Sequence, residues 1–100
     1  MANAARTFDP DAIRVPGVLD IEASGFGRGS FPIEIGFVLP DGESFCTLIR
    51  PAPGWTHWDP AAERLHRISQ ATARSHGRDA REVSLLLNER LHGLTLYCDG

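Results

Sequence analysis

The sequence predicts an α/β domain with a mixed sheet, in which a three-stranded antiparallel meander is followed by helices and a parallel strand. Three observations support this fold class. Short apolar segments separated by turn signals fill the first half of the chain, helix-capping signals dominate the second half, and a further apolar segment follows the last predicted helix. The chain has 100 residues, which suits one small domain.

Three strands are predicted in the first half of the chain, after a flexible leader that covers residues 1–14. The remaining residues, 15–100, are expected to form a single domain. The Gly-rich segment 25–30 and the Asp41-Gly42 pair separate the apolar segments, and both are strong turn signals. The predicted strands are Val15–Ile21, Phe31–Leu39 and Glu43–Ile49.

A helical segment is predicted after the loop at residues 51–58. Asp59 is a suitable N-cap and Pro60 suits the first helical position, so a helix is expected from Pro60 to about His66. Its buried side chains are expected to be Ala61, Leu65 and Ile68. Ser69 is expected to cap a second short helical turn that runs through Ala73 and ends at His76-Gly77.

A longer helix and a last strand complete the predicted fold. Asp79 and Glu82 have the spacing of a capping box, and Gly93 is a good helix stop. The apolar face is expected to contain Val83, Leu86, Leu87 and Leu91, widened by Leu85. The helix leads into Leu94–Cys98, a strand expected to lie parallel to the first one because a helical crossover normally returns the chain in that direction.

Composition limits the possible partners and the cellular location. The formal net charge is −3, so the chain lacks the global basic field of many nucleic-acid binders. No segment has the roughly 20 apolar residues of a membrane span, and the start of the chain has no signal-peptide core. Cys46 and Cys98 lie far apart and are expected to be two buried thiols in a reducing cytoplasm.

The segment Asp20-Ile21-Glu22 is the strongest candidate for chemistry. Residues i and i+2 of a strand point to the same face, so the two carboxylates are expected to project together at the end of an otherwise buried strand. Buried like charges are costly unless a cation compensates them, and closely spaced carboxylates suit Mg²⁺ or Mn²⁺. Gly25 follows closely, and a Gly allows the backbone to approach a ligand.

The order of these segments resembles the DEDD 3′–5′ exonucleases, the family of ribonuclease T and the bacterial polymerase III proofreading subunit. Residues 20–25, Asp-Ile-Glu-Ala-Ser-Gly, resemble the family's first exonuclease motif. The Glu-Ile-Gly core at 34–36 resembles its second strand, and Leu-His-Arg-Ile-Ser at 65–69 is similar to its His-Gly-Ile-Thr segment. Arg67 stands where the family has Gly. The resemblance covers about residues 15–100.

The resemblance implies a ribonuclease-H-like fold and an enzyme that removes nucleotides from single-stranded DNA or RNA 3′ ends by two-metal-ion hydrolysis. It implies that Asp20 and Glu22 are catalytic residues and ligands of two Mg²⁺ or Mn²⁺ ions. It also implies that four residues contact the substrate: Ala23, Gly25, Phe26 and His66.

The family uses two further acidic ligands and a general base, which are expected downstream of Cys98. The chain is therefore expected to be the N-terminal part of an exonuclease domain. The alternative is a non-catalytic module of the same fold that binds nucleic acid or docks a partner, and a small interaction domain with a fortuitous Asp-x-Glu is a third option. A truncated sheet would expose an edge that could pair with a second copy, so a homo-oligomer is also possible.

Several single residues keep two interpretations. Phe26 either stacks on the terminal base or is a turn residue that covers the sheet. His66 either lines the nucleotide pocket or is a half-buried surface residue, and Glu34 either supports the site or reaches solvent at a sheet edge. Trp55 and Trp58 are expected to pack at the edge of the core, with a base platform as the alternative. Arg64, Arg67 and Arg74 are expected to form a solvated face, with a phosphate clamp as the alternative.

Overall fold

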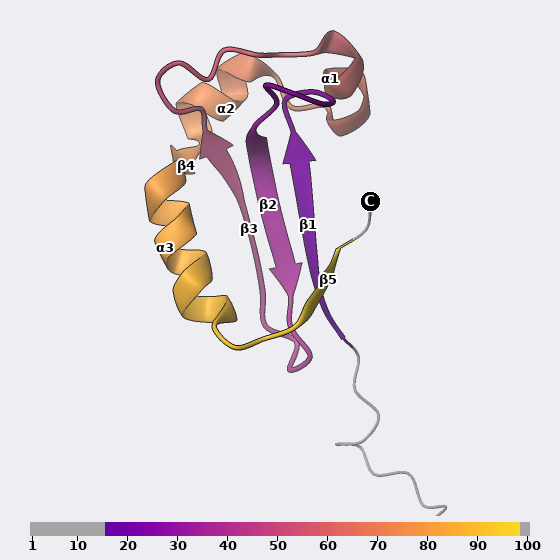
Figure 1. Cartoon of the computed structure of the whole chain (residues 1–100), viewed down its shortest axis with the longest axis vertical. Coiled ribbons are helices and arrows are strands. Elements are labelled where there is room, and N and C mark those ends of the chain that lie inside the picture. The colour runs from indigo at the N-terminus through magenta and orange to yellow at the C-terminus, as the bar shows by residue number, and fades with distance from the viewer. Residues whose placement is uncertain (1–15, 99–100) are drawn as a thin grey trace, which may run out of the picture.

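The computed structural model describes residues 16–98 and shows a five-stranded mixed sheet with three helices in that part of the chain (Figure 1). The predicted α/β fold class is confirmed. The predicted leader at residues 1–14 lies outside the described residues.

The antiparallel meander forms as the turn signals predict. It consists of β1 (Gly17–Ala23), β2 (Pro32–Val38) and β3 (Ser44–Arg50). The β2–β3 turn is closed by hydrogen bonds from the Leu39 N–H to the Glu43 carbonyl and from the Gly42 N–H to the Leu39 carbonyl. The Asp41 carboxylate also accepts a hydrogen bond from the Glu43 backbone N–H at 2.8 Å. Asp41 therefore sets the register of this hairpin locally, which explains why the sequence predicts it well.

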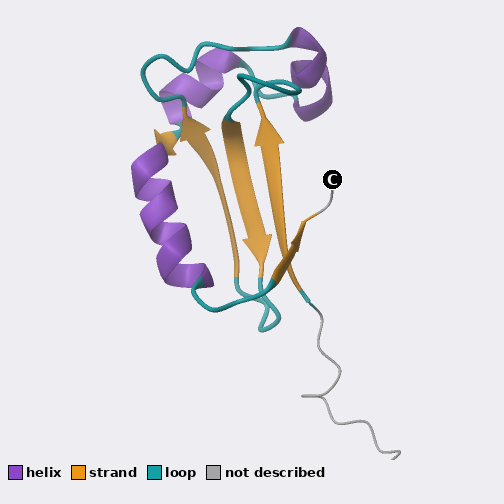
Figure 2. Ribbon diagram, viewed as in Figure 1, coloured by secondary structure: helices purple, strands orange, loops and turns teal. Residues whose placement is uncertain are grey.

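Two short strands extend the sheet on either side, giving the order β4-β3-β2-β1-β5 (Figure 2). β5 (Leu96–Cys98) pairs in parallel with β1, as predicted from the crossover. β4 (Arg78–Asp79) pairs in parallel with β3 and was not predicted. Two residues carry no strand pattern of their own, so this strand exists only through its pairing with β3.

The three helices begin at the predicted caps. In α1 (Pro60–His66) the Asp59 side chain accepts from the Ala61 N–H, and in α2 (Gln70–His76) Ser69 accepts from the Thr72 N–H. In α3 (Ala80–Leu91) the Asp79 side chain accepts from two first-turn N–H groups. α1 and α2 lie at the end of the sheet where β1 and β3 finish, and α3 runs beside the sheet (Figure 1).

Within residues 16–98 the buried core lies on one face of the sheet. The odd-numbered residues of β2, Ile33, Ile35 and Phe37, are almost fully buried. α3 covers this face by packing Val83 and Leu87 against a cluster that includes Ile35 and Ile49. The even-numbered residues point to the other face, where Val18, Val38 and Tyr97 are exposed.

Four burial predictions are wrong for reasons that follow from this arrangement. In α1 the buried residue is Ala62, and Leu65 is 75% exposed. In α3 Leu85 is exposed because Val83 and Leu87 face the sheet. Cys46 and Cys98 are both exposed: Cys46 points to the open face, and Cys98 lies on an edge strand.

No helix within residues 16–98 combines the length and the apolar character needed to cross a membrane.

Candidate active site at the carboxyl end of β1

The two carboxylates of the Asp-x-Glu motif share one face of β1. Asp20 and Glu22 pair with Gly36 and Glu34 of β2, so both project to the open face of the sheet. Asp20 is exposed and Glu22 is half-buried. The expectation that the rest of this strand is buried is wrong, since Val18 and Ile21 are each more than 40% exposed, at 42% and 43%.

A third carboxylate lies directly opposite the motif. Glu34 is the register partner of Glu22, and both side chains belong to the open face. Like charges at directly opposed positions of an antiparallel pair are destabilising. Within residues 16–98 the salt bridges are Arg50–Asp79 and Arg90–Glu43, so no arginine of this part neutralises these carboxylates. The idea that Glu34 reaches solvent at a sheet edge is wrong, because β2 is the central strand.

The open face also affects Cys46, which pairs with Gly36 beside these acids. Partial burial, followed by the negative charges of Glu34 and Asp20, raises the pKa of the Cys46 thiol above its ordinary value. The thiol therefore responds to the negative potential of the same face that carries Asp20 and Glu22.

A change of register at the end of β1 redirects the chain after Glu22. The pairing shifts between Glu22 and Ala23, and such irregularities re-aim side chains at the end of a strand. The next residue, Ser24, is fully buried. Its backbone N–H donates to the Phe31 carbonyl at 2.9 Å, and its hydroxyl accepts from the Phe31 N–H at 3.1 Å.

Ser24 also ties the motif to α1. Its carbonyl accepts a hydrogen bond from the Asp59 N–H at 2.8 Å, and its hydroxyl lies 3.5 Å from Nδ1 of His57. Sequence reasoning did not assign a role to Ser24 or His57. The only sign of a role for Ser24 in the sequence is its place as a small hydroxyl residue directly after the strand. The hydrogen-bond partners of Ser24 lie 7 to 35 positions away along the chain.

Gly25 is required by close packing beside this anchor. A Cβ at position 25 would overlap the His57 ring and would lie 3.0 Å from Cβ of Asp59. The group that approaches the Gly25 backbone in this structure is therefore His57.

The structure brings five of the six predicted site residues to one pocket of about 260 Å³ between the end of β1 and α1. They are Glu22, Ala23, Gly25, Phe26 and His66. Asp20 instead lines an adjoining cavity of about 440 Å³ on the open face, with Gly36 and Cys46. The motif therefore lies where the open face meets the β1–α1 pocket.

His66 lines the β1–α1 pocket with a fixed orientation of its ring. Its Nδ1 accepts a hydrogen bond from the Ile68 N–H at 3.0 Å, which leaves Nε2 as the donor nitrogen of the ring. Nε2 is buried and has no hydrogen-bond partner within residues 16–98. A buried donor without a partner is costly, so a bound acceptor oxygen would stabilise this arrangement.

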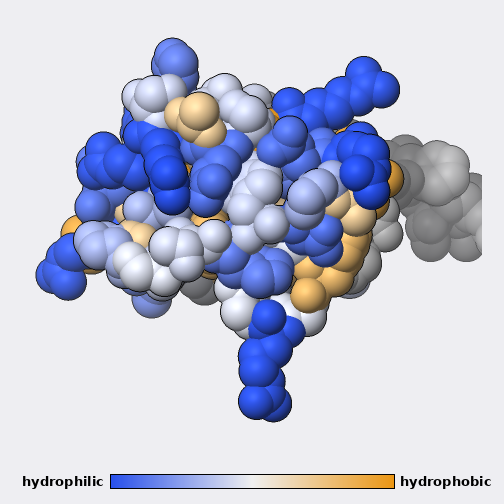
Figure 3. Space-filling view, turned by 90° about the horizontal axis from the view of Figure 1, so that it is seen from above, coloured by the Kyte–Doolittle hydropathy of each residue, from blue (hydrophilic) through white to orange (hydrophobic). Residues whose placement is uncertain are grey.

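Apolar side chains give the β1–α1 pocket a surface for a flat ring. Phe26 is 63% exposed, and exposed Ile21 and Leu65 line the same pocket. Phe26 therefore lines this pocket as a largely exposed residue. The view onto this end of the molecule shows apolar surface gathered at one side, with hydrophilic side chains over most of the rest (Figure 3).

Asp20 and Glu22 provide only part of the set of ligands that a hard divalent cation needs. Asp20 and Glu22 supply carboxylate oxygens on one face without a competing cation, and such oxygens suit Mg²⁺ or Mn²⁺. Residues 16–98 contain no group of three or more His, Cys, Asp or Glu side chains arranged to hold a metal ion. These two residues therefore fit part of a ligand set.

Comparison with known proteins identifies the fold. No protein-family model and no curated protein sequence matches the chain. Among solved structures, it is similar to the metal-free form of an E. coli exonuclease I complex with single-stranded DNA, with a TM-score of 0.65 and 15% identity over 84% of this chain. A product-bound structure of exonuclease I matches equally well, with a TM-score of 0.65 and 15% identity over 83% of this chain.

The likeness establishes a ribonuclease-H-like α/β fold of the kind found in exonuclease I, as expected from the sequence. The chain spans about a fifth of the length of these structures, 20% and 21% of the two matched chains. At 15% sequence identity, the similarity to exonuclease I concerns the fold of this chain.

Proposed function

We propose that this chain carries part of the active site of a DEDD-type, metal-dependent 3′–5′ exonuclease acting on single-stranded nucleic acid. The observation that carries the proposal is the pocket at the end of β1, which gathers Glu22, Ala23, Gly25, Phe26 and His66 beside Asp20. The fold of exonuclease I supports it, because the matched structures include complexes with single-stranded DNA and with an oligonucleotide.

Each residue has a role that its position permits. Asp20 and Glu22 hold divalent cations, which supply Lewis-acid stabilisation of the phosphate and an activated water when bound. The exposed ring of Phe26 stacks on the terminal base, and Nε2 of His66 donates to an oxygen of the terminal nucleotide. Ser24 keeps these groups together by joining the end of β1 to the start of α1.

A second candidate is a non-catalytic module that binds a single strand without cleaving it. The observation that favours it is the incomplete ligand set, since residues 16–98 contain no metal cluster of three or more candidate side chains. The two functions make the same prediction for strand binding and opposite predictions for strand shortening.

The test is an exonuclease assay on single-stranded DNA labelled at its 5′ end, in Mg²⁺ or Mn²⁺. We expect stepwise shortening from the 3′ end by a protein that combines this chain with the two further acidic ligands and the general base expected after Cys98. The Asp20→Asn variant should lose at least about 100-fold in rate, equivalent to about 2.7 kcal/mol of transition-state stabilisation. Asp41→Asn, which changes a carboxylate in the β2–β3 turn, is the matched control and should keep full activity.

Equal activity of Asp20→Asn and the parent chain would contradict the proposal. A strand that is bound but left intact in both metals by the protein with the full ligand set would support the non-catalytic module instead.

A further inference from the structure

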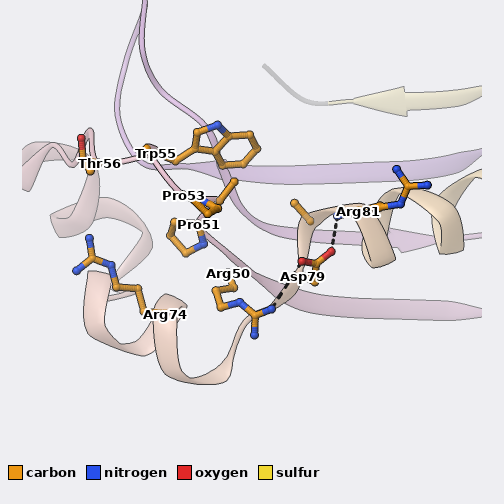
Figure 4. Close-up of a pocket in the computed structure, with 11 residues that line it drawn as sticks. Arg50, Pro51, Pro53, Trp55, Thr56, Arg74, Asp79 and Arg81 are labelled. Atoms are coloured by element: carbon orange, nitrogen blue, oxygen red, sulfur yellow. Dashed lines mark hydrogen bonds and ion pairs between the residues drawn. The ribbon is translucent and has the colours of Figure 1, made fainter.

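A second cavity lies at the same end of the sheet, where β3 finishes. Its volume is about 600 Å³, and its walls come from the loop after β3, from α2 and from the start of α3 (Figure 4). β1 and β3 point in the same direction because each is antiparallel to β2, so both cavities lie beyond the carboxyl ends of their strands. We call this second cavity the arginine cavity after three of its lining residues, Arg50, Arg74 and Arg81.

The charge of the arginine cavity is opposite to that of the whole chain. Three arginines and one carboxylate, Asp79, line it, which gives a local net charge of 3 − 1 = +2, whereas the chain has −3. Arg50 is paired with Asp79 at 3.7 Å. Arg74 and Arg81 have no carboxylate partner within residues 16–98. The cavity therefore attracts anions, and arginine is well suited to phosphate.

The arrangement of the arginines distinguishes between possible anions. Arg74 and Arg81 extend from α2 and α3 in different directions, with Arg50 between them (Figure 4). Guanidinium groups that extend in different directions suit a ligand with several separated phosphate groups better than one compact phosphate. An extended polyanion with a phosphate at regular intervals could contact them in succession.

Trp55 adds a surface for a base. One face of its ring stacks on Phe31 with 5.3 Å between ring centroids, and the side chain is still 37% exposed. The predicted packing of Trp55 at the core edge is therefore only part of its environment. A rigid, half-open indole next to arginines combines stacking with backbone neutralisation, which are the two elements of single-strand binding.

The arginine cavity and the β1–α1 pocket are linked through residues 55–57, although they have no lining residue in common. Trp55 and Thr56 line the arginine cavity, and the next residue, His57, packs against Gly25 of the β1–α1 pocket. Phe31, under the Trp55 ring, is hydrogen-bonded to Ser24 at the end of β1. Residues 55–57 therefore connect the lining of the arginine cavity to the contact with Gly25.

We infer that the arginine cavity binds the phosphodiester backbone and one base of a single-stranded nucleic acid whose 3′ end occupies the β1–α1 pocket. Arg74 and Arg81 contact successive phosphates, and Trp55 stacks on a base. The direction of the strand rests on the proposed function, whereas the binding itself can be measured without cleavage.

The test measures binding by fluorescence anisotropy, without metal, for a single-stranded oligonucleotide of about 12 nucleotides and for a mononucleotide. The Arg74→Ala/Arg81→Ala double variant should bind the oligonucleotide about 10-fold more weakly. The slope of log K against log salt should fall by about 1.4, since each phosphate contact on a single strand contributes roughly 0.7. Mononucleotide binding should be unchanged.

Two further variants control for charge and folding. Arg90→Ala removes one charge at the opposite end of α3, from a pair with Glu43 in the β2–β3 turn, and should leave binding and slope unchanged. Arg74→Lys/Arg81→Lys keeps both charges and should recover most of the affinity and the full slope. Circular dichroism melting checks that each variant is folded.

Unchanged oligonucleotide affinity and salt slope in the folded double alanine variant would overturn the inference. The double variant could instead keep its affinity for the oligonucleotide and lose only the thermal stabilisation that inorganic phosphate gives the parent chain. The cavity would then be a site for a free anion, and the inference would also be overturned. Loss of binding in the double variant, together with absence of any strand shortening by the protein with the full ligand set, would refute the proposed exonuclease while supporting this inference.

Discussion

At the scale of single residues, the pKa of the Cys46 thiol reflects the negative charge of the open face. Its thiol pKa is raised by partial burial and then by the carboxylates of Glu34 and Asp20. A raised thiol pKa means that the folded state favours the protonated form. The corresponding contribution to stability is present below the ordinary thiol pKa and is lost as the pH rises through the folded-state pKa.

We predict that Glu34→Gln lowers the pKa of Cys46, because it removes the carboxylate whose negative charge, after burial, contributes most to raising that pKa. The measurement is the pH profile of iodoacetamide modification in a Cys98→Ser background, where Cys46 is the only thiol. The midpoint should move to lower pH, and Glu89→Gln on the exposed part of α3 should leave it in place. A midpoint that is the same in the parent and Glu34→Gln would contradict the geometry of this face.

Residue-level prediction succeeded where the cause is local. Asp59, Ser69 and Asp79 cap their helices as expected, since an N-cap needs only its own first turn. The exposure of Cys46 was missed because strand alternation defines two faces but does not tell which one is covered. Ser24 was missed because its partners at Phe31, His57 and Asp59 become neighbours only after folding.

At the scale of elements, the contact between α2 and β3 is the most constrained. Gly77 ends α2, and a Cβ at this position would overlap backbone atoms of Arg50 and Ala73 and would lie 2.6 Å from the carbonyl carbon of Ile49. Backbone atoms cannot move aside as a flexible side chain can. This close approach places α2 at the end of β3 and so forms a wall of the arginine cavity.

We predict that Gly77→Ala lowers the free energy of unfolding by about 1–3 kcal/mol, the usual cost of overpacking. Urea denaturation followed by circular dichroism measures the change. Ser75→Ala changes an exposed side chain on the same helix and should have little effect. Equal stability of Gly77→Ala and the parent would show that α2 does not approach β3 this closely.

The elements differ in how far the sequence determines them. The meander strands carry apolar patterns and turn residues, so they were predicted within a few residues. β4 has only Arg78 and Asp79 and depends on pairing with β3, so no local pattern could predict it. α1 is too short to show a reliable apolar face, which explains why Ala62 is buried where Leu65 was expected.

At the scale of the whole molecule, the sheet has one covered and one open face, and the candidate metal ligands project from the open one. The capping and turn signals predicted the α/β class and the parallel return of β5 to β1. The convergence of the β1–α1 pocket and the arginine cavity at one end depends on the sheet order, which joins segments far apart in the chain.

Metal binding should be visible in the stability of the whole fold. A cation that binds only the folded state at about ten times its dissociation constant adds about 1.4 kcal/mol, which corresponds to roughly 6–11 °C in the melting temperature of a domain of this size. We predict such a rise with Mn²⁺ for the parent chain and for Asp41→Asn, measured by thermal denaturation. Asp20→Asn should show no rise, and a rise of equal size would place the cation elsewhere.

The most direct test of the central claim is anomalous scattering from crystals of this chain soaked with Mn²⁺ and a nucleoside monophosphate. We expect an anomalous peak within coordination distance of a carboxylate oxygen of Asp20 or Glu22, with the nucleotide base against Phe26. Soaked crystals without a peak at these carboxylates, or with a peak only at acids elsewhere such as Asp41 or Asp79, would contradict it.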